Sequence, residues 1–252
     1  MPERPSRDVV VDGRTHAVAV SVVIPCRNEA MNLPAVLSQL PAGLTEVIIV
    51  DGRSTDNTIE VARELVPDAV IVRQTGKGKG DALRAGFEAA RGEIIVMLDA
   101  DGSMSPREID SFLSELVRGA DLVKGSRQLP GGGSADLTPV RAAGNWVMST
   151  MFNRLFDASH TDLCYGYMAF WNRNLDVLMP ECTGFEVETW MCVSAQRAGL
   201  RVVEVPSQEG RRIYGRSNLR TVRDGIRVLH ILVGERWMAL RPRRRVPARG
   251  TV

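Results

Sequence analysis

The sequence contains no apolar run near the about 20 residues that a helix needs to cross a bilayer. Its first residues are polar and include proline, so the hydrophobic core of a signal peptide is missing as well. The four cysteines form no Cys-x-x-Cys pair and lie in apolar surroundings, which indicates buried thiols in a reducing compartment. We therefore expect a cytoplasmic protein that is soluble or lies peripherally on the cytoplasmic face of a membrane.

Lysine is also scarce: Lys77, Lys79 and Lys124 are the only lysines among 32 basic residues. With 30 acidic residues the net charge is +2, which argues against a globally basic nucleic-acid-binding protein. A chain of 252 residues with 44% hydrophobic content can bury a full core, which predicts one domain with an appendage. We predict a flexible tail over residues 1–16, a main domain over 17–210 and a basic C-terminal segment over 211–252.

Short β-branched runs alternate with amphipathic segments through the first half of the chain. Strands are expected at residues 17–25, 46–50, 69–72 and 94–98, with helices between them. Further strands are expected at 120–124, 165–171 and 201–205, and further helices from 106, over 140–156 and over 184–198. This alternation predicts an α/β fold with a mostly parallel sheet covered by helices, as in Rossmann-like domains.

The strand over 94–98 ends in two carboxylates, Asp99 and Asp101, separated by one residue. Such a pair can converge on a hard cation, and Mg²⁺ favours one or two carboxylates together with substrate phosphates. A solvated loop that happens to carry two acids is the alternative. Arg27-Asn28-Glu29 and Asp51 follow two other strands, and the carboxyl ends of parallel strands share one edge. We therefore expect all three clusters to build one ligand pocket.

Two glycine-rich loops follow. Residues 76–80 read Gly-Lys-Gly-Lys-Gly, which lacks the Gly-x-x-x-x-Gly-Lys-Ser/Thr pattern of nucleotide hydrolases but suits an anion beside a helix N-terminus. A flexible charged turn is the alternative there. Residues 128–136 contain three consecutive glycines and are expected to form a mobile lid or a plain connection.

The C-terminal segment combines an expected amphipathic helix from about residue 219 with arginines before, within and after it. A basic amphipathic helix can lie on an anionic membrane surface. Packing on its own sheet, or on a second subunit in a homodimer, is the alternative.

The motifs Val22-Val23-Ile24-Pro25, Val50-Asp51-Gly52-Arg53-Ser54, Gly76-Lys77-Gly78-Lys79-Gly80 and Asp99-Ala100-Asp101 resemble those of the inverting GT-A glycosyltransferases of family 2. Gly125-Ser126-Arg127, Thr161-Asp162 with Gly166-Tyr167, Gly184-Phe185-Glu186-Val187-Glu188 and Arg212 with Gly215 narrow the resemblance to dolichol- or polyprenyl-phosphate mannosyl- or glucosyltransferases. The resemblance covers residues 18–235.

The resemblance implies roles for individual residues. Metal binding, of Mg²⁺ or Mn²⁺, falls to Asp99 and Asp101, and Ser103 stands where the family often has a glutamine. Arg127, Arg141 and Arg212 correspond to arginines that bind the acceptor phosphate or cover the site. Asn218 stands where a lysine usually follows. The residues implied to hold the nucleotide sugar are Pro25, Arg27, Asn28, Glu29, Asp51, Lys79, Asp81 and Asp99.

The expected activity is transfer of a hexose from a nucleoside-diphosphate sugar, of GDP-mannose or UDP-glucose type, to a polyprenyl-phosphate-like acceptor. An ionised phosphate needs no strong base, so Glu186 and Glu188 would position groups. If a glycolipid, polysaccharide or natural-product hydroxyl is the acceptor, one of them should be the catalytic base. A sugar nucleotidyltransferase is the more remote alternative, because its early Gly-x-Gly-x-Arg loop is missing. A non-catalytic sugar-nucleotide-binding module is a third.

Overall fold

The computed structural model describes residues 5–215 and 221–239. A seven-stranded sheet runs through the centre in the order β10-β7-β9-β6-β3-β4-β5. Strand β9 is antiparallel to both neighbours and every other pair is parallel, which confirms the predicted α/β class. The strands of this sheet are β3 (Val20–Cys26), β4 (Glu46–Asp51), β5 (Val70–Arg73), β6 (Ile94–Met97), β7 (Leu122–Ser126), β9 (Met168–Trp171) and β10 (Val202–Pro206).

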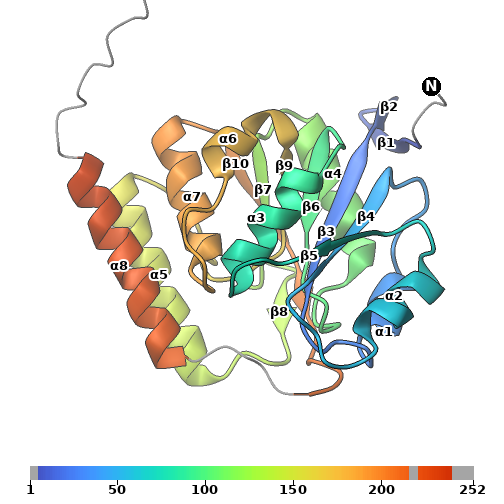
Figure 1. Ribbon diagram of the computed structural model, residues 1–252. Coiled ribbons are helices and arrows are strands. Elements are labelled where there is room, and N and C mark those ends of the chain that lie inside the picture. The colour runs from blue at the N-terminus through green and yellow to red at the C-terminus, as the bar shows by residue number, and fades with distance from the viewer. Residues whose placement is uncertain (1–4, 216–220, 240–252) are drawn as a thin grey trace, which may run out of the picture.

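Helices cover both faces of this sheet (Figure 1). Alternate residues of β3 explain why: Val22 and Ile24 enter one hydrophobic cluster with α4, and Val23 enters the other with α3. A strand buried on both sides is continuously apolar, as these strands are. The helices are α1 (Leu33–Leu37), α2 (Thr58–Leu65), α3 (Lys79–Ala89), α4 (Ile109–Val117), α5 (Pro139–Phe156), α6 (Leu175–Leu178), α7 (Val187–Ala198) and α8 (Thr221–Ala239), with 3-10 turns at Pro106–Glu108 and Asn172–Asn174.

The prediction of a flexible tail over residues 1–16 is wrong for its described part. Strands β1 (Arg7–Val11) and β2 (Arg14–Val18) form an antiparallel hairpin in which Val11 pairs with Arg14. The intervening Asp12 and Gly13 both have positive φ, the backbone that a two-residue hairpin turn requires. The hairpin is held to α4 by a two-fold ion pair between Arg7 and Asp110, with both N–O distances 2.6 Å.

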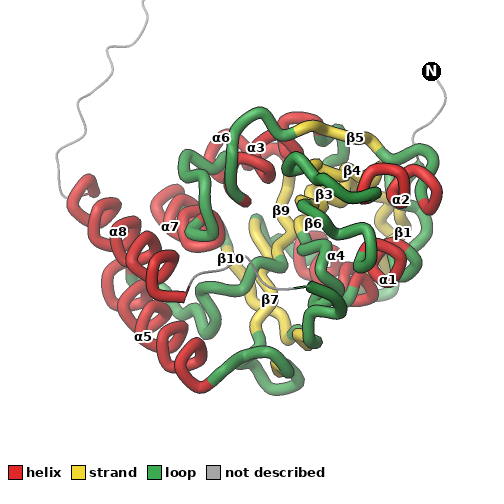
Figure 2. Tube along the Cα trace, turned by 60° about the horizontal axis from the view of Figure 1, so that its bottom comes forward, coloured by secondary structure: helices red, strands yellow, loops and turns green. Residues whose placement is uncertain are grey.

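The triglycine loop is tied down at one point. Its short strand β8 (Gly133–Ser134) pairs in parallel with β11 (Gln208–Glu209). Downstream, α5 and α8 pack side by side at one end of the molecule (Figures 1 and 2). None of the described helices is both long and apolar enough to cross a membrane. The arginines at positions 241–249, on which part of the membrane prediction rests, lie outside the described residues.

Candidate active site

The ends of β3, β4 and β6 lie at one edge of the sheet, because Cys26 is in register with Asp51, and Val23 with Met97. A cavity of about 570 Å³ opens there. Side chains from the ends of β3 and β6 line it, as the sequence predicts. Asp51 does not line it: its side chain accepts a 2.9 Å hydrogen bond from the Ser54 amide. We call this space the donor cavity. Predicted site residues that line it are Pro25, Arg27, Glu29, Lys79, Asp99, Asp101 and Arg212.

Two further predicted residues shape loops around the donor cavity instead of lining it. Asn28 has a left-handed backbone (φ 59°), and its side-chain oxygen accepts a 2.7 Å hydrogen bond from the Thr55 amide. Asp81, in the first turn of α3, accepts a hydrogen bond from the Gly76 amide at 3.1 Å. Asp81 therefore fixes a backbone that lines the cavity, and Asn28 fixes the loop after β4.

The glycine-lysine loop packs against residues 182–184. A Cβ at Gly78 would lie 2.1 Å from the Thr183 carbonyl oxygen, and one at Gly80 would lie 2.4 Å from that of Cys182. Gly80 also donates a 3.0 Å hydrogen bond to Thr183. These positions need glycine because the two backbones touch. The contact brings the start of α3 to the segment that leads into α7.

Lys79 joins the two segments. Its ammonium lies 2.6 Å from Asp99 Oδ1 and 2.7 Å from Glu188 Oε1, and the lysine and glutamate side chains are 9% and 6% exposed. Burial alone would lower the pKa of Lys79, but the two carboxylates outweigh burial and raise it above its ordinary value. Burial raises the pKa of Asp99, against the opposing effect of Lys79. A protonated lysine thus bridges a predicted metal ligand and a predicted base.

The donor cavity is electropositive. Four acidic side chains line it, Glu29, Asp99, Asp101 and Asp224, against seven basic ones. Such an excess attracts an anion of the size of a nucleoside diphosphate. The basic residues are Arg27, Arg53, Lys77, Lys79, Arg212, Arg223 and Arg227.

Residues 210–214 form a segment at the donor cavity, which we call the strap, and its residue Arg212 lines the cavity. Its Arg212 guanidinium lies 2.5 Å from Glu29 Oε1 and 3.4 Å from Asp101 Oδ2. Asn32 pins the following turn, because its side chain accepts from the Tyr214 amide at 2.8 Å and donates to the Tyr214 carbonyl at 3.2 Å. The strap therefore connects predicted residues from both ends of the chain.

A second cavity of about 210 Å³, which we call the acceptor cavity, adjoins the first. Lys79, Asp99, Asp101 and Arg212 line both cavities, so the predicted metal ligands lie where the two spaces meet. Its wall away from this junction is largely apolar and comes from the loop after β6, from the start of α5 and from α8. These apolar residues are Met104, Leu137, Val140, Met148 and Val228.

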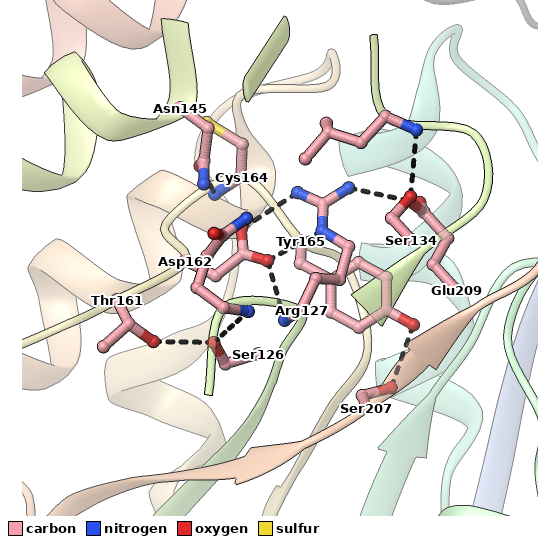
Figure 3. Close-up of polar contacts among 12 residues, drawn as sticks. Ser126, Arg127, Ser134, Asn145, Thr161, Asp162, Cys164, Tyr165, Ser207 and Glu209 are labelled. Carbon is pink, nitrogen blue, oxygen red and sulfur yellow. Dashed lines mark hydrogen bonds and ion pairs between the residues drawn. The ribbon is translucent and has the colours of Figure 1, made fainter. Parts of the chain in front are cut away.

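Arg127 lies in the wall of the acceptor cavity and is almost completely paired (Figure 3). Its guanidinium makes two bonds to Asp162, at 2.7 and 2.9 Å, and one to Glu209 at 3.0 Å, and its side chain is only 4% exposed. It also stacks on the ring of Tyr165, with 4.7 Å between the guanidinium carbon and the ring centroid. Burial alone would lower the pKa of Arg127, but these carboxylates raise it.

Arg141 stands differently in the same cavity. It lies in the first turn of α5, its side chain is 27% exposed, and its partner is the exposed Asp136 at 3.0 Å. Surface pairs of this kind are weak and easily exchanged. Of the predicted acceptor arginines, Arg141 is therefore the one whose charge can be redirected to a ligand.

The residues at the junction fit a hard divalent cation. Asp101 Oδ1 accepts from the amide and hydroxyl of Ser103, at 3.0 and 2.7 Å, so Ser103 orients this carboxylate. Within residues 5–215 and 221–239, no three His, Cys, Asp or Glu side chains form a closed metal site. Two carboxylates suit Mg²⁺ or Mn²⁺ when a substrate phosphate supplies further oxygen ligands to the ion.

The family model for glycosyl transferase family 2 matches residues 21–178. The chain belongs to this family. The match includes the parallel strands β4, β5, β6 and β7, nearly all of β3, the glycine-lysine loop and both aspartates, and with them the residues that line the donor cavity from Pro25 to Asp101.

Two named relatives match 89% and 73% of this glycosyltransferase. It is 33% identical to an undecaprenyl-phosphate mannosyltransferase of Micrococcus luteus, over 89% of this chain and 98% of the relative. It is 33% identical to a polyprenol monophosphomannose synthase of Mycolicibacterium smegmatis, over 73% and 75% of the two chains. The glucosyl-3-phosphoglycerate synthase of Mycobacterium tuberculosis, solved with Mn²⁺, UDP and its product, has a similar fold (TM-score 0.69, 23% identity, 86% of this chain and 80% of that one).

Several residues of this glycosyltransferase's site were not singled out from the sequence. Asn32 could have been noticed three residues after Glu29, to which its amide donates at 2.5 Å. Glu209 carried no signal, because its partner Arg127 is 82 residues away. Arg223 and Arg227 belong to the expected C-terminal helix, for which membrane contact and packing on the protein were both open, and the structure places them at the donor cavity.

Proposed function

We propose that this glycosyltransferase transfers a hexosyl group from a nucleoside-diphosphate sugar, of GDP-mannose or UDP-glucose type, to a polyprenyl phosphate. The observation that carries the proposal is the junction of two unlike cavities at Lys79, Asp99 and Asp101. One cavity is basic and suits a diphosphate, and the other is walled by apolar side chains. The named relatives from Micrococcus luteus and Mycolicibacterium smegmatis support the same acceptor class.

The environment of Glu188 supports an acceptor that is already ionised. Its carboxylate is engaged by Lys79, whose raised pKa keeps the ammonium charged. To act as a base, Glu188 would have to give up or share its 2.7 Å ion pair with Lys79. A phosphate monoester, with its second pKa near about 6, attacks the anomeric carbon without giving up a proton. As the new C–O bond forms, the bond to the diphosphate breaks and the nucleoside diphosphate leaves as an anion.

The chain's own residues divide the remaining work. Asp99 and Asp101 would hold Mg²⁺ or Mn²⁺, which when bound supplies charge neutralisation for the departing diphosphate. Arg141 would bind the acceptor phosphate through a redirected guanidinium. Arg127, fixed by Asp162 and Glu209, would hold the acceptor cavity in shape.

An exposed apolar surface supports contact with a membrane, where a polyprenyl phosphate resides. Trp146 on α5 is 69% exposed and Ile226 on α8 is 50% exposed, although both helices also wall the acceptor cavity. Exposed apolar side chains on two helices that pack against each other suit an interaction site. We call this the α5/α8 surface, made of Val140, Trp146, Val147, Ile226, Leu229 and Val233.

A hydroxyl acceptor is the second candidate, and one observation favours it. Four basic side chains line the acceptor cavity, against six acidic ones, so it does not by itself attract an anion. In that case Glu188 would act as the base. The acidic residues are Asp99, Asp101, Asp136, Glu188, Glu209 and Asp224.

The proposal is tested by release of nucleoside diphosphate. The purified chain is incubated with UDP-glucose or GDP-mannose and Mg²⁺ or Mn²⁺, with undecaprenyl phosphate in detergent or with the matching undecaprenol. We expect release that requires the phosphate and is abolished by Asp101→Ala but not by Asp68→Ala, a change at an exposed turn. Release that undecaprenol supports equally well would overturn the phosphate acceptor, and release of hexose 1-phosphate in place of nucleoside diphosphate would indicate nucleotidyl transfer.

A further inference from the structure

The first two turns of α8 form part of the donor cavity wall. Arg223, Asp224 and Arg227 all line that cavity, although they follow its β3 residues by about 200 positions in the sequence. Because residues four apart share one face of a helix, Arg223 and Arg227 point the same way. The outward face of the same helix carries the exposed Ile226, Leu229 and Val233. Helix α8 is therefore two-sided, with guanidinium groups toward the donor cavity.

Most other cations of the donor cavity are already committed. Lys79 is bound between Asp99 and Glu188, and Arg212 between Glu29 and Asp101. Arg53 donates to the Thr75 carbonyl. Within the described part of the chain, Arg27, Lys77 and Arg223 form no ion pair, which leaves them and Arg227 as candidates for an incoming diphosphate.

Arg227 is held only by two long contacts to carboxylates, and its guanidinium lies beside Gly184. Its Nη1 lies 3.7 Å from Glu186 Oε2 and 3.7 Å from Asp224 Oδ1, beyond hydrogen-bond distance, and its side chain is 38% exposed. Glu186 is 7% exposed, and its Oε2 has no hydrogen-bond partner among the described residues. A Cβ at Gly184 would lie 2.4 Å from Glu186 Oε2 and 2.5 Å from Arg227 Nη1, so a side chain there would push these two side-chain ends aside.

We propose that Arg227, assisted by Arg223, is a diphosphate ligand that α8 supplies to the donor cavity. A guanidinium with free N–H groups matches the paired oxygens of a diphosphate, and the nearby carboxylates Glu186 and Asp224 keep it aimed without saturating it. The inference rests on the proposed function, since it names part of the site for the same donor. It makes donor binding depend on α8, the helix whose outer face belongs to the α5/α8 surface.

The test is calorimetric binding of a ladder of ligands in the presence of Mg²⁺. The ladder runs from nucleoside through monophosphate to diphosphate, with uridine and guanosine series, and uses the full chain. We expect Arg227→Gln to weaken diphosphate binding roughly 10- to 100-fold, the loss of one charge-assisted hydrogen-bonding group, and to leave nucleoside binding unchanged. Arg227→Lys should fall between, and Gly184→Ala, whose Cβ would meet both Glu186 Oε2 and Arg227 Nη1, should weaken diphosphate binding by a smaller factor than Arg227→Gln.

Controls separate this role from structural support. Arg63→Gln removes an exposed arginine from α2, outside both cavities, and should change nothing. Equal diphosphate affinity in Arg227→Gln and wild type would overturn the inference, as would parallel loss of nucleoside and diphosphate binding, which means general damage. If Arg227→Gln does not fold, Arg223→Gln and Gly184→Ala carry the same test. Failure of the wild type to bind either nucleoside diphosphate would instead refute the proposed function itself.

Discussion

Lys79 and Glu188 form a buried ion pair, and the role of Glu188 in it differs between a phosphate acceptor and a hydroxyl acceptor. The Lys79 ammonium, whose pKa is raised by Asp99 and Glu188 against the effect of burial, lies 2.7 Å from Glu188 Oε1, so this oxygen is already engaged in the protein without substrate. The same lysine contacts Asp99, so the pair is part of the junction between the cavities. Removing the charge of the glutamate alone therefore distinguishes the two acceptor classes.

For Glu188→Gln we expect kcat with undecaprenyl phosphate to fall no more than about tenfold, because an ionised acceptor needs no base. The measurement is steady-state release of nucleoside diphosphate at saturating donor. Glu181→Gln, at a residue that lines neither cavity, is the matched control. A fall of several orders of magnitude at unchanged donor affinity would favour the hydroxyl acceptor with Glu188 as its base.

His160 predicts a dependence of stability on pH. Burial lowers the pKa of His160 to about 4, whereas a histidine in an unfolded chain has a pKa of about 6.5. The unfolded chain therefore binds a proton that the native chain refuses, and the native state loses stability as pH falls from about 6.5 to 4. The loss from this residue is on the order of 3 kcal/mol.

Denaturant unfolding of His160→Gln should show a shallower fall in the free energy of unfolding between pH 6.5 and 4.5 than the wild type. His16→Gln, on an exposed hairpin strand, should keep the slope of the wild type. An unchanged slope in His160→Gln would mean that other groups cause the acid sensitivity.

Individual residues also mark how far the sequence can be interpreted. Asp99 and Asp101 were predictable, because a short apolar strand positions whatever follows it. The surroundings of Arg127 were not, because its carboxylate partners Asp162 and Glu209 come from segments 35 and 82 residues away. A motif identifies a residue type at a position, whereas burial and pairing depend on which distant segments meet there.

At the scale of elements, the strap over residues 210–214 depends on side chains more than on regular structure. The side chain of Asn32 donates to the carbonyl of Tyr214 and accepts from its amide, as a neighbouring strand would do with its backbone. Ile213 donates a 3.1 Å hydrogen bond to the Asp101 carbonyl and adds a third attachment. The strap thereby holds Arg212 over the carboxylates of Glu29 and Asp101.

Asn32→Ala should release this strap without unfolding the sheet, at a cost of about 1–3 kcal/mol for the lost hydrogen bonds. We expect trypsin to cut after Arg211 and Arg212 faster than in the wild type, with the cleavage sites assigned by mass spectrometry. Asn174→Ala removes a comparable amide from a 3-10 turn remote from the site and serves as the control. Equal cleavage rates in Asn32→Ala and wild type would show that Asn32 does not secure the strap.

The hairpin at the N-terminus shows the other side of predictability at this scale. Asp12-Gly13 is a favoured dipeptide for a two-residue turn, and Val9 and Val11 alternate with exposed residues. That signal was present in the sequence, but the prediction of a flexible tail did not use it. The ion pair of Arg7 with Asp110, 103 residues away, was beyond any local pattern.

At the scale of the whole molecule, the donor cavity adjoins the acceptor cavity, and the helices that wall the acceptor cavity also carry the α5/α8 surface. The parallel strands fix the first, and this arrangement followed from the order of strands and helices in the sequence. The acceptor cavity and the α5/α8 surface depend on helices α5 and α8. The end of α5 and the start of α8 are 65 residues apart in the sequence. Because α8 carries guanidinium groups inward and apolar side chains outward, a surface that binds its outer face would contact the same helix that lines the donor cavity.

We therefore expect the protein to float with anionic vesicles, and the combined change Trp146→Ser, Ile226→Ser and Leu229→Ser to abolish flotation. Val10→Ser, which removes an equally exposed apolar residue from the hairpin, should float like the wild type. If vesicles order α8, they should also tighten binding of the nucleoside diphosphate in the wild type and not in the triple variant. Flotation that survives in the triple variant would assign membrane contact to another part of the chain. Flotation without tighter binding would mean that α8 is already fully ordered in solution.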